Sequence, residues 1–211
     1  MIGQGFDIVI GTIANYLSII IIPIMAIILG LKILREKKQL GKYNIIRIVT
    51  CSIFLTLTWI LIWEFLYESA GLNTILSEDV IISINTFSFY SFGLGLVITL
   101  ALGIVVYANQ LETLYFASAF IYIGMFITFL LTGYTGFLLP YIFTGGVIAV
   151  VFLFITGIRL KDNGSLGLAI FATLIFPTLI SEKTIIGQLM SVAYPIFGII
   201  LALGYFKPYK E

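Results

Sequence analysis

Long apolar runs separated by short polar segments set the pattern of this sequence. Each run is close to the roughly 20 residues that a helix needs to cross the hydrocarbon core of a bilayer. A transmembrane barrel would instead show segments of about ten residues with alternating polarity. The pattern therefore predicts an all-α membrane protein, a seven-transmembrane-helix bundle with helices at about 8–31, 45–67, 80–107, 113–132, 138–158, 165–180 and 185–206.

Composition supports lipid as the solvent of the chain. Hydrophobic residues make up 61% of it and charged residues 10%, with a mean hydropathy of +1.16, whereas an ordinary soluble domain is about 25% charged. A soluble core of this length has too little interior to hide so much apolar surface. We expect a multi-pass protein of the cell membrane, with residues 1–211 forming a single polytopic transmembrane domain.

The positive charges predict the orientation of the bundle. Six basic residues fall between positions 32 and 47, and a charged side chain at the bilayer centre costs about 2.5–3.5 kcal/mol on insertion scales. Cytoplasmic loops carry the excess of lysine and arginine, so this segment is expected to be cytoplasmic. With the N-terminus outside and the C-terminus cytoplasmic, ten of the eleven basic residues fall on the inner side, and Lys183 is the exception.

The residue types that the chain lacks exclude most catalytic and metal-binding chemistry. The chain has no histidine and a single cysteine, Cys51, which removes histidine-dependent nucleophiles and most zinc sites. The net charge of +1 argues against a nucleic-acid partner, and none of the predicted helices carries an acidic residue near its midpoint that could couple transport to protons or sodium. We expect no enzymatic activity, no catalytic residue, no cofactor and no metal site.

Small and weakly polar residues recur at helical spacing, which is typical of helix–helix contacts in membranes. The stripe on the 80–107 helix is the most continuous, although Phe92 interrupts it, and the 185–206 helix carries Gly187, Ser191, Tyr194, Gly198 and Ala202. Close packing is the ordinary interpretation of such stripes. The functional alternative is a polar cavity, for which the candidate lining residues are Asn85, Ser88, Ser91, Thr99, Trp59, Trp63, Glu64 and Tyr194.

Prolines and turn residues mark further features. Pro23, Pro177 and Pro195 lie inside predicted helices, where each removes a backbone hydrogen bond and produces either a static kink or a hinge. Residues 162–165 read as a turn with Ser165 as the N-cap of the next helix. Residues 133–136 read as another turn.

The predicted topology resembles two kinds of seven-helix protein. Seven helices with the N-terminus outside allow a three-plus-one-plus-three arrangement, which resembles the sugar-efflux transporters. The chain lacks their repeated proline-glutamine motif, and its two halves do not match in sequence. The topology also resembles the seven-helix sensor regions of archaeal and bacterial signalling proteins.

These observations leave two functional hypotheses open. The first is a passive transporter or channel-like protein for a neutral or weakly polar solute or an ion. The second is a non-catalytic subunit of a larger membrane complex, or a seven-helix sensor module that acts through a partner chain. The expected partners are the lipid bilayer and either a homo-oligomer or other membrane subunits. The isoleucine-rich, histidine-free composition is typical of a prokaryotic source.

Overall fold

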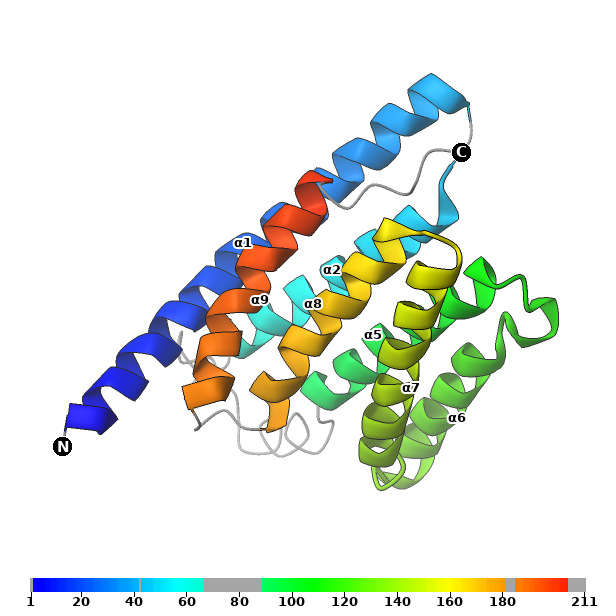
Figure 1. Cartoon of the computed structure of the whole chain (residues 1–211). Coiled ribbons are helices and arrows are strands. Elements are labelled where there is room, and N and C mark those ends of the chain that lie inside the picture. The colour runs from blue at the N-terminus through cyan, green and yellow to red at the C-terminus, as the bar shows by residue number, and fades with distance from the viewer. Residues whose placement is uncertain (1, 42, 67–88, 181–184, 205–211) are drawn as a thin grey trace. The chain divides into compact units, whose positions relative to one another are not determined.

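The computed structural model describes residues 2–41, 43–66, 89–180 and 185–204 (Figure 1). Within these ranges the chain is helical and forms no strand, so the all-α prediction is confirmed. The described helices are α1 (Ile2–Leu40), α2 (Ile45–Glu64), α5 (Phe89–Ala108), the short 3-10 helix η2 (Glu112–Leu114), α6 (Ala117–Thr132), α7 (Leu138–Arg159), α8 (Asn163–Ile180) and α9 (Ile185–Leu203).

Six of these seven α-helices are long and apolar enough to cross a membrane. The seventh, α8, is 18 residues long, and its stretch Asn163–Ile175 is apolar as well. The described part of the chain is therefore that of a multi-pass integral membrane protein.

Helix α1 is longer than the sequence pattern predicts. The apolar run ends near Leu31, but the helix continues to Leu40 through the basic residues. Lysine, arginine, glutamate and glutamine are strong helix formers, so charge marks the edge of the bilayer without ending the helix. The end comes at Gly41, whose φ of 68° is a left-handed conformation that glycine adopts without strain, and whose N–H bonds the Lys37 carbonyl at 3.0 Å.

The turn before α8 also differs from its prediction. The capping residue is Asp162 rather than Ser165, and α8 begins two residues earlier, at Asn163. The Asp162 carboxylate accepts hydrogen bonds from the N–H groups of Gly164 at 3.0 Å and Ser165 at 3.1 Å. A carboxylate satisfies the free N–H groups of a first turn and complements the positive end of the helix, so Asp162 takes the capping position.

Contacts divide the chain into two compact units. The terminal unit comprises residues 1–47 and 150–211, and the central unit comprises residues 48–149. This grouping places α1 with α8 and α9, which differs from paired triple-helix bundles, where the first three helices would belong together.

In the terminal unit α1 packs along α9, and α8 packs on the other side of α9 (Figure 1). Three contacts run in the same order along both helices. Tyr194 bonds Ser18, Gly198 meets the end of the Met25 side chain, and Lys32 bonds the Ala202 carbonyl. Helices α1 and α9 are therefore parallel, and the small residues of α9 allow the close approach, as its predicted stripe requires.

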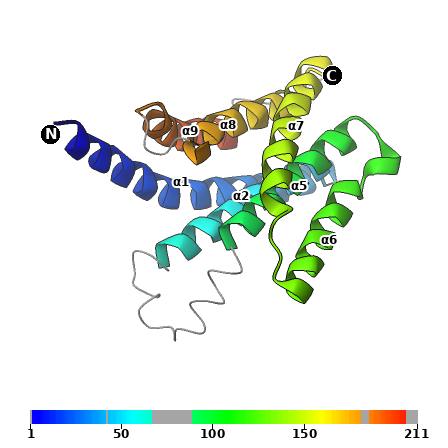
Figure 2. The same ribbon diagram turned by 90° about the horizontal axis from the view of Figure 1, so that it is seen from below.

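The central unit has an aromatic core around Phe92. The α5–η2–α6 connection folds α6 back beside α5, as Figure 2 shows. Phe92, Leu138 and Ile142 are buried together, and the Phe92 ring lies 5.4 Å from that of Phe126 and 5.0 Å from that of Phe129, centroid to centroid. The phenylalanine that interrupts the α5 stripe thus fills the contact between α5, α6 and α7.

Candidate functional site

Buried and partly buried polar groups lie along the contact between α1 and α9. The Tyr194 hydroxyl donates to Ser18 Oγ over 2.6 Å, and the Ser18 hydroxyl donates to the Ala14 carbonyl over 2.8 Å. The Tyr194 ring packs edge-on against Phe171 of α8, 5.9 Å between centroids. Ser18 is 3% exposed, so these hydroxyls are held inside the terminal unit.

Gln188 is a further buried polar residue of α9, nearer the start of the helix than Tyr194. Gln188, Pro195 and Ala202 are spaced by seven residues and so share one side of the helix, the side that Lys32 of α1 reaches at Ala202. Gln188 is 8% exposed, and its Oε1 atom has no hydrogen-bond partner among the described residues. A buried amide oxygen without a donor costs about 1–3 kcal/mol.

Pro195 adds an acceptor to the same stretch. It is among the most deeply buried residues, and because its nitrogen carries no hydrogen, the carbonyl of Ser191 loses its helical partner. The Ser191 hydroxyl bonds the Gln188 carbonyl at 2.7 Å. We call Ser18, Gln188, Ser191 and Tyr194 the polar seam. Six residues of helix separate Gln188 from Tyr194, which is about 9 Å along the axis.

The chemistry of the polar seam is neutral. Its groups are two serine hydroxyls, one phenol and one amide, and none carries a charge near neutral pH. Such groups exchange hydrogen bonds with water or with a hydroxylated or amide-bearing solute. They offer neither an acid–base pair nor a nucleophile activated by a neighbouring base.

A second polar cluster lies in the central unit around Thr99. The Thr99 hydroxyl is 2.8 Å from the Gly95 carbonyl and 2.7 Å from the Tyr141 hydroxyl, and Ser118 bonds the Thr99 carbonyl at 3.3 Å. Nearby, Tyr122 donates to the Phe92 carbonyl over 2.9 Å. These groups find their partners within the protein, so the cluster holds α5, α6 and α7 together.

The predicted lining residues that the structure describes belong to two different units. Tyr194 belongs to the terminal unit, whereas Trp59, Trp63, Glu64, Ser91 and Thr99 belong to the central unit. Trp59 is 58% exposed, and Glu64 is exposed at the end of α2. Asn85 and Ser88 lie outside the described residues. Tyr194 bonds Ser18 in the polar seam, and Thr99 bonds Tyr141 in the contact between α5 and α7.

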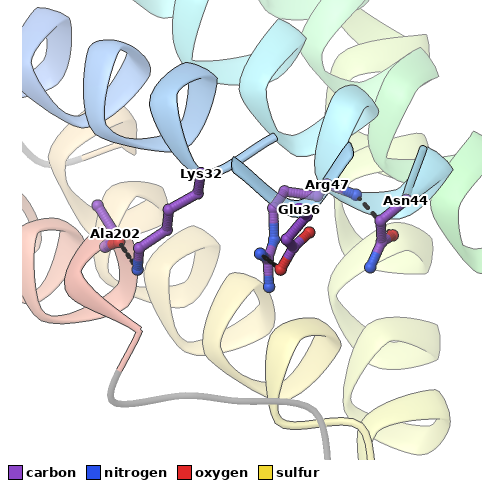
Figure 3. Close-up of polar contacts among 5 residues, drawn as sticks. All are labelled: Lys32, Glu36, Asn44, Arg47 and Ala202. Carbon is purple, nitrogen blue, oxygen red and sulfur yellow. Dashed lines mark hydrogen bonds and ion pairs between the residues drawn. The ribbon is translucent and has the colours of Figure 1, made fainter. Parts of the chain in front are cut away.

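The basic segment forms an ordered corner between α1 and α2, shown in Figure 3. Lys32 Nζ donates to the Ala202 carbonyl at 2.5 Å, where a cation complements the negative end of α9. Glu36 forms an ion pair with Arg47, and the Asn44 side chain accepts the Arg47 N–H at 3.2 Å as the N-cap of α2.

Sequence reasoning missed Gln188 and Glu36. Gln188 is a lone amide in a run of apolar residues, which is a signal that a search restricted to charges and small residues overlooks. Glu36 stands within a cluster of cations, so its charge is easily taken for part of a solvated surface. Among the described residues no group of three or more acidic or cysteine side chains is placed to hold a metal ion.

Comparisons with protein-family models, with curated proteins and with solved structures give no match for this chain. Its function is therefore argued from its own residues.

Proposed function

We propose that the chain crosses the cell membrane seven times, with its N-terminus outside and its C-terminus in the cytoplasm. The parallel packing of α1 and α9 supports an odd number of crossings, because two helices that run in the same direction are separated by an even number of reversals. The concentration of cations in the α1–α2 corner supports a cytoplasmic position for that corner. On this basis α8 spans the bilayer as well.

Within this topology we propose a passive transporter or channel-like protein for a neutral or weakly polar solute. The observation that carries the proposal is Gln188, whose side-chain oxygen is buried without a donor among the described residues. In a membrane bundle such a group is costly unless it is satisfied, and a passing solute or water molecule supplies the donor. The seam differs from the predicted path along α2, α5 and α9 in that it involves α1 and α9.

The neutral lining supports facilitated passage without coupling to an ion gradient. Proton- and sodium-coupled carriers keep an ionisable group on their path, and the polar seam consists of amide and hydroxyl groups. We propose accordingly that the protein is not an enzyme and uses no cofactor.

Replacing Gln188 with leucine is expected to lower solute permeability about tenfold, because one hydrogen bond to a neutral group is worth about 1–1.5 kcal/mol and 1.4 kcal/mol corresponds to a factor of ten. The measurement is stopped-flow light scattering of proteoliposomes exposed to glycerol or urea gradients. Thr99→Val is the matched control, because it removes a buried hydroxyl from the central unit.

The two variants distinguish the possible routes. If Thr99→Val lost permeability while Gln188→Leu kept the wild-type permeability, the path would lie in the central unit. That result would contradict passage along the polar seam. Wild-type proteoliposomes no more permeable than protein-free vesicles to glycerol, urea and potassium would contradict transport of these solutes altogether.

A second candidate function, a subunit of a larger membrane assembly, is favoured by the outer face of α6. Gly124, Thr128 and Thr132 follow each other at four-residue intervals, and a side chain added at Gly124 would meet nothing within 4 Å. Spacing of this kind is typical of helix pairs in membranes. Gly124 and Thr132 are exposed.

Gly124→Leu is expected to weaken association with a partner or a second copy about tenfold or more, because a bulky side chain separates two closely packed backbones. Cross-linking in native membranes followed by gel analysis measures this. Gly103→Leu is the control, since that glycine of α5 also has open space, whereas the small residues before it at four-residue intervals, Gly95 and Thr99, are already covered by residues of α6 and α7. A cross-linked band that is unchanged in Gly124→Leu would contradict association through α6.

A further inference from the structure

The outward face of α1 is an unbroken apolar stripe that ends in two cations. The stripe consists of exposed residues at intervals of three and four, as one side of a helix requires: Ile13, Tyr16, Ile20, Ile24, Ile27, Leu31 and Leu34. Lys38 continues the same spacing, and Arg35 lies beside it, both exposed. The opposite side of the helix holds Ser18, Met25 and Lys32, which contact α9.

The length of this stripe matches the bilayer. From Ile13 to Leu34 the helix rises about 32 Å, and the hydrocarbon core of a bilayer is about 30 Å thick. The stripe therefore spans the hydrocarbon, and Arg35 and Lys38 stand at the depth of the lipid phosphates at its cytoplasmic edge.

Arg35 and Lys38 also differ from Lys32, Lys37 and Arg47, each of which has a polar partner within the described residues. Lys32 bonds the Ala202 carbonyl, Arg47 is paired with Glu36, and Lys37 bonds the Tyr43 hydroxyl at 2.5 Å and lies 4.4 Å from the centre of its ring. The described residues provide no ion pair for Arg35 or Lys38.

We propose that Arg35 and Lys38 bind the phosphate of an anionic lipid, whose acyl chains lie along Ile27, Leu31 and Leu34. The site joins an apolar track and two cations in the order in which a phospholipid presents its chains and its phosphate. The occupant is therefore a membrane lipid of negative charge rather than a soluble anion. A lipid bound here would also lie against the helix that carries the Lys32–Ala202 contact.

The test is the association of spin-labelled phosphatidylglycerol with the full chain in phosphatidylcholine vesicles, compared with spin-labelled phosphatidylcholine. Each basic residue near a membrane surface contributes roughly a fivefold preference for anionic lipid, so the wild-type preference is expected to fall about five- to twentyfold in Arg35→Gln/Lys38→Gln. The control is Lys37→Gln/Lys161→Gln, which removes the same charge from exposed positions outside the stripe. It is expected to lose less preference than Arg35→Gln/Lys38→Gln, because Lys37 and Lys161 contribute to the general attraction of the surface but do not contact the phosphate of the bound lipid. Far-UV circular dichroism checks that each variant keeps its helices.

Three outcomes would overturn the proposal. One is an equal loss of preference in both double variants, which indicates a general electrostatic attraction. Another is wild-type protein that does not distinguish the two lipids. The third is displacement of the labelled lipid by millimolar glycerol phosphate, which indicates a site for a soluble phosphate.

Discussion

Gly157→Ala is expected to lower the free energy of unfolding by about 1–3 kcal/mol, the usual cost of forcing extra atoms into a packed contact. A Cβ atom at this position would lie 2.8 Å from the backbone nitrogen of Leu166 and 3.0 Å from its Cα. The backbone cannot move aside as the end of a flexible side chain would. The Asp162 N–H bonds the Gly157 carbonyl at 2.9 Å, so a displacement would also disturb the cap of α8.

Gly30→Ala is the matched control for this prediction. Gly30 lies in α1 of the same unit, and a Cβ there would meet nothing within 4 Å. Alanine favours a helix over glycine by up to about 1 kcal/mol, so this variant is expected to be equal to or more stable than the wild type. Unfolding in mixed detergent micelles, followed by far-UV circular dichroism, gives both values. Equal stability of Gly157→Ala and Gly30→Ala would show that α7 and α8 do not approach as closely as described.

The pair of glycines illustrates what the sequence can and cannot predict. Both are small residues in apolar helices, and each is compatible with a close contact between helices. Only the structure separates them, because the difference lies in which neighbouring backbone each residue meets. Helical periodicity identifies a face, but it does not identify the helix that packs on that face.

The helices themselves follow from the apolar runs. The ranges predicted for α7 and α9 begin at the observed residues, because a bilayer imposes a length on each run. The ends of α1 and the start of α8 depend on Gly41 and Asp162, local features that hydrophobicity does not record. The residue at which α1 leaves the hydrocarbon and the residue at which the helix ends are set by different properties of the chain. In α1 these two residues lie several positions apart.

The functional residues were predictable only in part. Tyr194 was selected beside Pro195 on the small face of its helix, and the structure places its hydroxyl on Ser18. Thr99 was selected by the same rule, and its hydroxyl bonds Tyr141 within the central unit. Both are polar residues on a helix face lined by small residues, so the sequence pattern does not distinguish them. The pairing of α1 with α9, which brings Ser18 to Tyr194, is a long-range property that no local pattern encodes.

Removal of Arg47 alone is expected to destabilise the protein by about 1–3 kcal/mol, and simultaneous removal of Glu36 is expected to restore much of that loss. The two side chains form an ion pair with 22% and 26% of their surfaces exposed. Breaking such a pair leaves one carboxylate without its partner, which costs more than the pair itself contributes. The cost is below that of a fully buried pair because a quarter of each side chain reaches solvent.

The destabilisation expected on removing Arg47 arises mainly at Glu36. Its second oxygen, Oε2, is buried and has no hydrogen-bond partner in the described part of the chain, so in Arg47→Leu the carboxylate would lose its ion-pair partner as well. The double variant Glu36→Leu/Arg47→Leu removes both charges and leaves apolar side chains at the edge of the bilayer. A coupling energy of about 1–3 kcal/mol between the two positions is therefore expected.

A double-mutant cycle measured by the same micelle titration tests this expectation. Arg35→Leu serves as the control, because removal of an exposed charge away from such contacts changes stability by no more than about 0.5 kcal/mol. Strictly additive effects of Glu36→Leu and Arg47→Leu would mean that the pair does not tie α1 to the start of α2. The corner would then depend on Gly41 and the Asn44 cap alone, and the cations of this segment would be held in place by the lipid surface rather than by the protein.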